Sequence, residues 1–190
     1  MKVLLLEDDH SLARMMHEIL THNGHELDHA SNMNHARKLM NGHNVAVLDI
    51  LLGDGHLGSE LMNLFNCPVV LFTSLDARGL EDMGVNPTDS GRQIYLVSKP
   101  ISPRVIMDCL ESVVIVRDIL ERILVESPDN TSLVEAADSF RSTHAAVRLH
   151  IRDLKLLDRW LDLPPLGKTE EANAPYLELL DDVRSYLGKK

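Results

Sequence analysis

The first 125 residues alternate between short apolar runs of strand length and longer segments whose apolar residues recur every three or four positions. Such alternation is typical of βαβ units, which build a parallel sheet with helices on its faces. Two of the runs, 45–48 and 69–72, are apolar throughout, as expected for central strands that are covered on both sides. The predicted strands are residues 3–6, 26–29, 45–48, 69–72 and 94–97. We therefore predict an α/β fold with a five-stranded, doubly wound parallel sheet.

Helices are predicted between the strands and after the last of them. Periodic apolar residues mark 11–20, 34–40 and 57–65. A stretch without glycine follows at 102–126, in which Pro103 suits the first turn of a helix. Its apolar residues form two adjoining stripes, which is more than one sheet face needs to cover a helix. We expect one long helix over about 103–126, with a further packing partner at its far end.

The chain beyond residue 126 is predicted to be a small all-α domain. A break signal at 127–131 precedes Ser132 and Glu135, whose spacing fits a capping box, so a helix is predicted from 132 to about 163. Pro164 and Pro165 end it, a polar linker runs to 173, and a last short helix spans 175–187. The predicted domains are therefore 1–125 and 127–190, with the long helix shared between them.

Composition excludes several classes of protein. The formal net charge of −10 has the wrong sign for a chain that coats nucleic acid or an anionic membrane. Cys67 and Cys109 lack the spacing of a zinc site or a disulfide framework. The opening apolar run, 3–6, is too short for a signal peptide or a membrane span. We expect a cytoplasmic protein that does not bind membranes.

Reactive side chains stand directly after the predicted strands. Open α/β sheets bind ligands at the carboxyl ends of their strands, so these side chains are expected to meet at one edge. Three of them are carboxylates, which repel one another unless a hard cation such as Mg²⁺ lies between them. The residues are Glu7 and Asp8 after the first strand, Asp49 after the third, Thr73 after the fourth and Lys99 after the fifth.

This set of side chains is suited to phosphoryl transfer. A carboxylate beside Mg²⁺ can attack phosphorus and form an acyl phosphate, which gives Asp49 a second possible role. Lys99 would supply a positive charge to one phosphoryl oxygen, and the Thr73 hydroxyl a hydrogen bond to another. In such reactions positioning and charge stabilisation do most of the work.

Together these residues resemble the receiver domain of two-component response regulators. The matching segments are Leu4-Leu5-Leu6-Glu7-Asp8-Asp9, Val47-Leu48-Asp49, Val70-Leu71-Phe72-Thr73-Ser74 and Ser98-Lys99-Pro100. The Asn23-Gly24-His25 turn and the Asp54-Gly55 loop are similar too. The resemblance covers about residues 1–125 and implies a flavodoxin-like receiver fold.

The resemblance also implies roles for single residues. Asp49 would be the phosphoacceptor, Glu7, Asp8, Asp49 and the backbone carbonyl of Leu51 would hold Mg²⁺, and Thr73 and Lys99 would contact the phosphoryl group. The phosphoryl donor would be a histidine kinase or a phosphotransfer protein. The chain would then act as a phosphoacceptor rather than as an enzyme on a separate substrate, and Asp9 receives no ligand role.

Four departures from the family pattern stand out. The switch position three residues before the lysine holds Leu96 instead of an aromatic residue, and Tyr95 beside it should face the other side of the strand. Gly53 replaces a common proline four residues after the acceptor. The span from Asp49 to Thr73 is short and predicts a clipped third helix, whereas the span from Thr73 to Lys99 is long and predicts a short helix plus a loop.

The tail leaves three hypotheses for the output of the protein. Basic residues recur on the expected 132–163 helix, beside a heptad seam that includes His144, Val147 and Ile151. Acidic residues nevertheless outnumber basic ones beyond residue 126, and no helix-turn-helix is recognisable, which favours a dimerisation or protein-interaction module. The alternatives are an atypical DNA-binding domain and a phosphorelay bundle that uses His144. The basic residues are Arg141, Arg148, Arg152, Lys155 and Arg159.

Eight of the ten histidines lie between His10 and His56, which invites a metal-site interpretation. No combination of histidine and acidic residues has ligand spacing on one element, however. We therefore expect these histidines to lie on the solvated surface.

Overall fold

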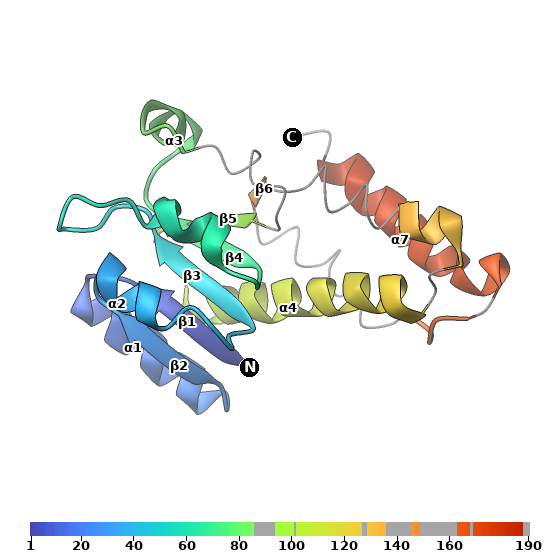
Figure 1. The fold of residues 1–190 in the computed structure, drawn as a ribbon, viewed down its shortest axis with the longest axis horizontal. Helices are drawn as coiled ribbons and strands as arrows, with labels where there is room; N and C mark the ends of the chain where they lie inside the picture. Colours follow the sequence, from blue (N-terminus) through green and yellow to red (C-terminus); the bar gives the residue numbers. More distant parts are fainter. Residues whose placement is uncertain are drawn as a thin grey trace.

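The computed structural model of the protein describes residues 1–85, 94–100, 102–126, 129–135, 146–148, 163–167 and 169–187. Parallel strands form one sheet in the order β2-β1-β3-β4-β5-β6 (Figure 1). The strands are β1 (Lys2–Leu6), β2 (Glu26–Ala30), β3 (Val45–Asp49), β4 (Val69–Thr73), β5 (Ile94–Ser98) and β6 (Ala146–Arg148). The first five confirm the predicted strands and the doubly wound arrangement.

The sixth strand corrects the prediction for the tail. Residues 146–148 pair in parallel with β5, in a register that sets Val147 opposite Tyr95 and Arg148 opposite Leu96. The predicted helix over 132–163 was therefore wrong at this point, although residues 131–135 are helical. An edge strand leaves backbone groups unpaired, and the pairing of residues 146–148 with β5 satisfies some of these groups. The helical periodicity of the sequence gives no sign of this pairing. The other residues of the proposed seam, His144 included, lie outside the described residues.

Helices cover both faces of the sheet. One face is covered by α1 (His10–His22) and the first half of α4 (Pro103–Glu126), and the other by α2 (Met33–Lys38) and the 3₁₀ helix η1 (Gly58–Leu64) (Figure 1). Leu80 of α3 (Ala77–Asp82) joins the core on the side of α2 and η1. The clipped third helix and the short fourth helix are confirmed in η1 and α3. The 57–65 segment is thus 3₁₀ rather than α-helical, which suits a short connection of this kind.

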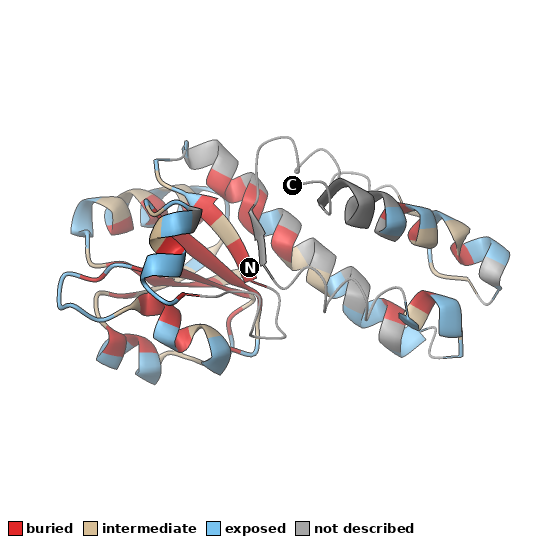
Figure 2. Cartoon of the chain, turned by 90° about the horizontal axis from the view of Figure 1, so that it is seen from above, coloured by how far each residue is buried: buried red, intermediate tan, exposed pale blue. Residues whose placement is uncertain are grey.

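Alternation along the strands divides the core into two layers. Val3, Leu5 and Val47 face α1 and α4, whereas Leu4 and Leu48 face α2 and η1, and all five are fully buried. Figure 2 shows the central strands as an unbroken buried layer between helices whose outer faces are exposed. Full burial of such a side chain contributes about 1.5–3 kcal/mol, so these layers hold the strand ends, and hence the site, in place.

The long helix α4 also carries a second, smaller core. Ile106 and Leu110 pack against the sheet, whereas Ile123, near the other end, packs with Leu133 and with Tyr176 of α7 (Glu170–Leu187). The packing partner predicted for the far end of α4 is thereby identified (Figure 1). The two cores are continuous along the helix.

Helix α7 begins five residues earlier than predicted. The Thr169 hydroxyl accepts a hydrogen bond from the Ala172 amide at 3.2 Å, so Thr169 caps the helix and Pro175 lies inside it. The polar run before Pro175 was therefore wrongly interpreted as a linker. Its Asn173 is fully buried, donates to the Gly167 carbonyl at 2.9 Å and accepts from the Gly167 amide at 2.8 Å. These two bonds fix the segment 163–167 against the helix.

Candidate functional site

The carboxyl ends of β1, β3, β4 and β5 bring together the five side chains predicted to form the site. Lys99 donates hydrogen bonds to Oε2 of Glu7 and to Oδ2 of Asp49, each at 2.8 Å. Asp49 is only 7% exposed. The position between β1 and β3 is where the strand order reverses, the place at which open sheets bind ligands.

Glu7 is the most deeply buried of the three carboxylates, at 1% exposure. Burial raises the pKa of Glu7, and the ion pair with Lys99 opposes this rise. Its Oε1 accepts from the Asp9 amide at 3.2 Å, and its backbone carbonyl lies 2.8 Å from Nε2 of His29. Glu7 is therefore held at both its side chain and its backbone.

Lys99 remains a cation in spite of its burial. Burial alone would lower the pKa of Lys99, but the hydrogen bonds to Asp49 and Glu7 outweigh it and raise the pKa above the ordinary value. The ammonium also lies 5.0 Å from the centre of the Phe72 ring, within the range of a cation–π interaction. One fixed positive charge thus pairs with two carboxylates, those of Glu7 and Asp49.

Asp8 completes the acidic cluster. Ligand oxygens of Glu7, Asp8 and Asp49 lie within 4.8 Å of one another, which is close enough to share one metal ion. Hard oxygen donors in this number suit Mg²⁺ or a similar divalent cation. The Asp8 Oδ2 accepts a hydrogen bond from the Gly53 amide at 2.8 Å.

Thr73 is placed by its strand and by the following turn. It pairs with Ser98 in the register of β4 and β5, and its carbonyl accepts from the Lys99 amide at 2.8 Å. Its hydroxyl oxygen accepts from the Leu75 amide at 3.1 Å, so the hydroxyl proton can be donated elsewhere. The peptide bond after Lys99, to Pro100, is cis.

The loop after β3 folds back on itself beside the site. Leu51 and Leu57 form an antiparallel bridge, and the Leu51 amide donates to Oδ1 of Asp49 at 3.3 Å. Gly58 lies so close to this strand that a Cβ atom on it would be 1.8 Å from the Asp49 carbonyl oxygen. Only glycine allows the chain to enter η1 at this distance from the acceptor strand.

The helix-capping role of Asp9 explains why the third acidic residue of the run stands apart from the cluster. Asp9 Oδ1 accepts from the amides of Ser11 at 2.8 Å and Leu12 at 3.2 Å, and so caps α1. Its side chain is engaged with the first turn of the helix.

Tyr95 and Leu96 lie on opposite faces of β5, as the alternation of a strand requires. Tyr95 is buried in the layer under α4, and burial raises its pKa. Leu96 is half-buried and packs with the other layer. The aromatic ring of this strand therefore faces away from the side that holds the switch position.

Sequence reasoning missed three contacts of the site. The Gly53 amide, the Phe72 ring and the imidazole of His29 all touch site residues or their backbone. The sequence held a signal for the Gly53 contact, because the receiver pattern commonly has proline at this position. Proline has no amide proton and could not donate this bond. The surface prediction for the histidines was wrong for His43, which is 9% exposed and lies 2.9 Å from Asp28 Oδ2.

Solved receiver domains share the fold of the N-terminal part of this chain. A CheY-like response regulator receiver domain protein from Methanospirillum hungatei JF-1 matches with a TM-score of 0.52 and 22% identity, over 60% of this chain and 92% of that one. The BeF3-activated N-terminal receiver domain of RstA from Klebsiella pneumoniae matches with a TM-score of 0.51 and 21% identity, over 60% and 98%. The chemotaxis protein CheY4 of Vibrio cholerae gives 0.50 and 20%, over 59% and 97%. The N-terminal part therefore has the receiver fold.

No family model matches the sequence, and no curated protein matches it either. Within the described residues, none of the helices has the length and apolar character needed to cross a membrane.

Proposed function

We propose that the protein is a response regulator whose Asp49 accepts a phosphoryl group from a histidine kinase or a phosphotransfer protein. The observation that carries the proposal is the position of Lys99, whose ammonium bridges Asp49 and Glu7 at 2.8 Å each. A buried aspartate paired with a lysine and set beside two further carboxylates has the charge arrangement that phosphoryl transfer needs.

In the proposed transfer, a carboxylate oxygen of Asp49 attacks the phosphorus of a phosphohistidine. The new P–O bond forms as the P–N bond breaks, and the leaving imidazole takes up a proton. Lys99 is close enough to Asp49 to contact an oxygen of the transferred group, and the Thr73 hydroxyl proton is available for another. Both contacts stabilise negative charge that is otherwise costly at a buried position.

Glu7, Asp8 and Asp49 would hold Mg²⁺, together with the backbone carbonyl of Leu51. The fit rests on the donor set, in which three carboxylates have ligand oxygens within 4.8 Å of one another and only two of them, Glu7 and Asp49, pair with an ammonium of the described residues. When bound, the ion would neutralise charge on the phosphoryl oxygens. The protein itself fixes Asp49 and shields most of the Asp49 side chain from water.

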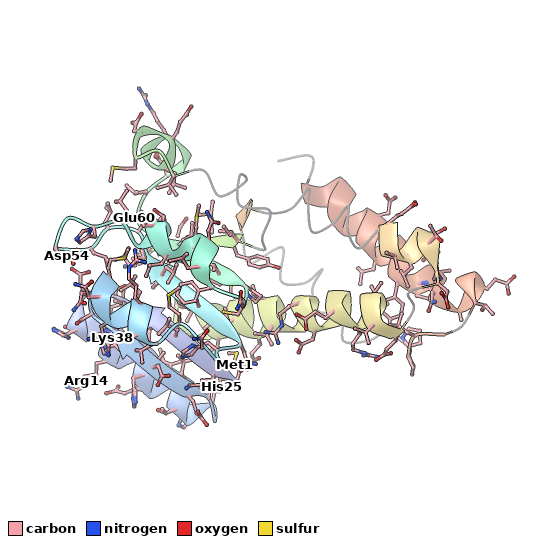
Figure 3. All side chains as sticks on the ribbon, viewed as in Figure 1. Met1, Arg14, His25, Lys38, Asp54 and Glu60 are labelled. Atoms are coloured by element: carbon pink, nitrogen blue, oxygen red, sulfur yellow. The ribbon has the colours of Figure 1, made fainter. Side chains whose placement is uncertain are left out.

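Phosphodonor labelling tests the assignment of Asp49. We expect acetyl phosphate with Mg²⁺ to add one phosphoryl group to the full chain, seen by intact mass, and Asp49→Asn to abolish it. Asp54→Asn is the matched control because Asp54 is exposed on the loop that follows the acceptor strand (Figure 3). Full labelling of Asp49→Asn would refute the site.

We further propose that the output is an interaction of the tail, through a homodimer or a downstream protein. Support comes from α4, which joins the sheet core to the second core around Ile123 and Tyr176. The exposed side chains of α7 include Glu171, Glu178 and Asp181, whose charge opposes contact with DNA. Such a protein would act in the cytoplasm with its kinase.

The oligomeric state tests this output. Light scattering on the full chain, with and without beryllofluoride and Mg²⁺, is expected to show a dimer in at least one state. A monomer in both states would contradict the dimer. Salt-dependent binding of duplex DNA would favour the alternative of a DNA-binding output.

A further inference from the structure

Gly53 makes the only contact by which the loop after β3 reaches Asp8 among the hydrogen bonds of the described residues. Its amide donates to Oδ2 of Asp8 at 2.8 Å. A Cβ atom at Gly53 would lie 2.7 Å from the same oxygen, which is closer than real Cβ contacts allow. Because that oxygen is the end of a flexible side chain, a residue larger than glycine would displace the Asp8 carboxylate rather than the backbone.

The backbone of the loop fixes Gly53 independently of Asp8. The Leu52 amide donates to the His56 carbonyl at 3.3 Å, and the Gly55 amide donates back to the Leu52 carbonyl at 2.9 Å. The Gly58 amide then donates to the Ile50 carbonyl at 3.0 Å, which closes the turn. The donor therefore occupies a set position toward which the carboxylate is drawn.

The charge balance explains why this donor matters for Asp8 in particular. Lys99 is shared by Glu7 and Asp49, whereas no ion pair in the described part of the chain includes Asp8. Hydrogen bonds to charged groups are about twice as strong as those between neutral groups. The Gly53 amide thus holds the one carboxylate of the cluster that has no ammonium beside it.

We propose that Gly53 is a positioning residue for the divalent cation, acting through Asp8. By holding one oxygen of Asp8, it keeps the carboxylate near Glu7 and Asp49 before the ion binds, and so sets the affinity for Mg²⁺. The proposal rests on the proposed function, since it assumes that this cluster binds Mg²⁺. Loss of a hydrogen-bond partner of a metal ligand typically costs about 10–100-fold in metal affinity.

The test is the dissociation constant for Mg²⁺, measured by titration calorimetry on the full chain without any phosphodonor. Gly53→Ala is expected to bind Mg²⁺ at least about ten-fold more weakly than the native protein. Its melting temperature without metal should stay close to that of the native protein, because only a side chain has to move. The matched control is His56→Ala, since the His56 side chain is exposed and its contacts in the loop are made by its backbone.

A second measurement covers the case in which Gly53→Ala does not fold. NMR spectra of the native protein and of Asp8→Asn are compared. The Gly53 amide proton resonance should lie further upfield in Asp8→Asn, because its hydrogen bond to a charged acceptor is lost. Native-like Mg²⁺ affinity of a folded Gly53→Ala, or an unmoved Gly53 amide in Asp8→Asn, would overturn the inference while leaving the proposed function intact. Failure of the native protein to bind Mg²⁺ would instead overturn the metal site and this inference together.

Discussion

Lys99 reaches across a whole strand to bind Asp49, since it follows β5 and Asp49 ends β3, with β4 between them. The ammonium lies over the ring of Phe72 on that intervening strand, at 5.0 Å from its centre. The aromatic ring therefore adds a cation–π attraction to the two hydrogen bonds of the ammonium. The ion pair joins three strands at the edge where the site lies.

Lys99→Ala is expected to destabilise the metal-free protein by about 3–5 kcal/mol, because it leaves the buried carboxylates of Glu7 and Asp49 without their cation. The measurement is urea unfolding at neutral pH in the presence of a chelator. Lys99→Arg, which keeps the charge, is the control and should lose less. An unchanged free energy of unfolding in Lys99→Ala would show that the pair contributes nothing to stability.

Asp49→Asn should have the opposite sign and stabilise the metal-free protein by about 1 kcal/mol. Burial is the main cause of the raised pKa of Glu7, and the negative charge of Asp49 beside it raises the pKa further, whereas Lys99 keeps its pair with Glu7 after the substitution. Unfolding of Asp49→Asn is compared with that of Asp54→Asn, which removes an exposed charge nearby. Saturating Mg²⁺ should shrink the difference. A clear loss of stability in Asp49→Asn would contradict repulsion within the cluster.

Gly58→Ala is expected to cost several kcal/mol, roughly the upper range for a single substitution, because the added Cβ would meet the Asp49 carbonyl oxygen at 1.8 Å. Backbone, rather than a side chain, would have to shift. The control is Gly79→Ala in α3, where the nearest atom would be a flexible Leu75 side chain at 3.2 Å and alanine favours the helix. Equal thermal stability of the two variants would disprove the close approach.

The stability contributed by Asp28 should disappear in acid. Its hydrogen bond to Lys2, and then its contact with His43, lower the pKa of Asp28 below the ordinary 3.8. Because the folded state holds the ionised form, this contribution is present above pH 3.8 and is lost as the pH falls through the lower folded value. Comparison of native protein and Asp28→Asn by chemical unfolding at pH 7 and pH 3 tests it. A difference that does not shrink at pH 3 would assign it to another cause.

The sheet was predictable from its apolar strands. The meeting of Glu7, Asp49 and Lys99 was predictable because each follows or ends a strand at the same edge. Once 45–48 was identified as a buried strand, the position of Asp49 at the sheet edge followed from geometry, and the same holds for Glu7 and Lys99. Side-chain alternation likewise placed Tyr95 and Leu96 on opposite faces. These conclusions need only a period of two and a parallel topology.

Two of the missed features depend on contacts between residues far apart in the chain, and a third depends on a local helix cap. The Gly53 bond to Asp8 spans 45 residues, and no local pattern encodes it. His43 is polar and therefore predicted at the surface, but pairing with Asp28 makes its burial tolerable. Helix α7 begins at Glu170 because Thr169 caps it. Proline is common in the first turn of a helix, so Pro175 suggested a later start than the structure shows.

A single rod connects the two cores. Helix α4 has 24 residues and is therefore about 36 Å long, and Ile106 near its start and Ile123 near its end belong to one continuous core. If α4 moves as a rigid rod, a tilt of the end beside the sheet displaces Ile123 further than it displaces Ile106. Residues 163–167, fixed to α7 by Asn173, would travel with the Ile123 end as one body. Mechanical gain, rather than a new contact at the site, is what this arrangement would offer to the phosphorylation signal that we propose for Asp49.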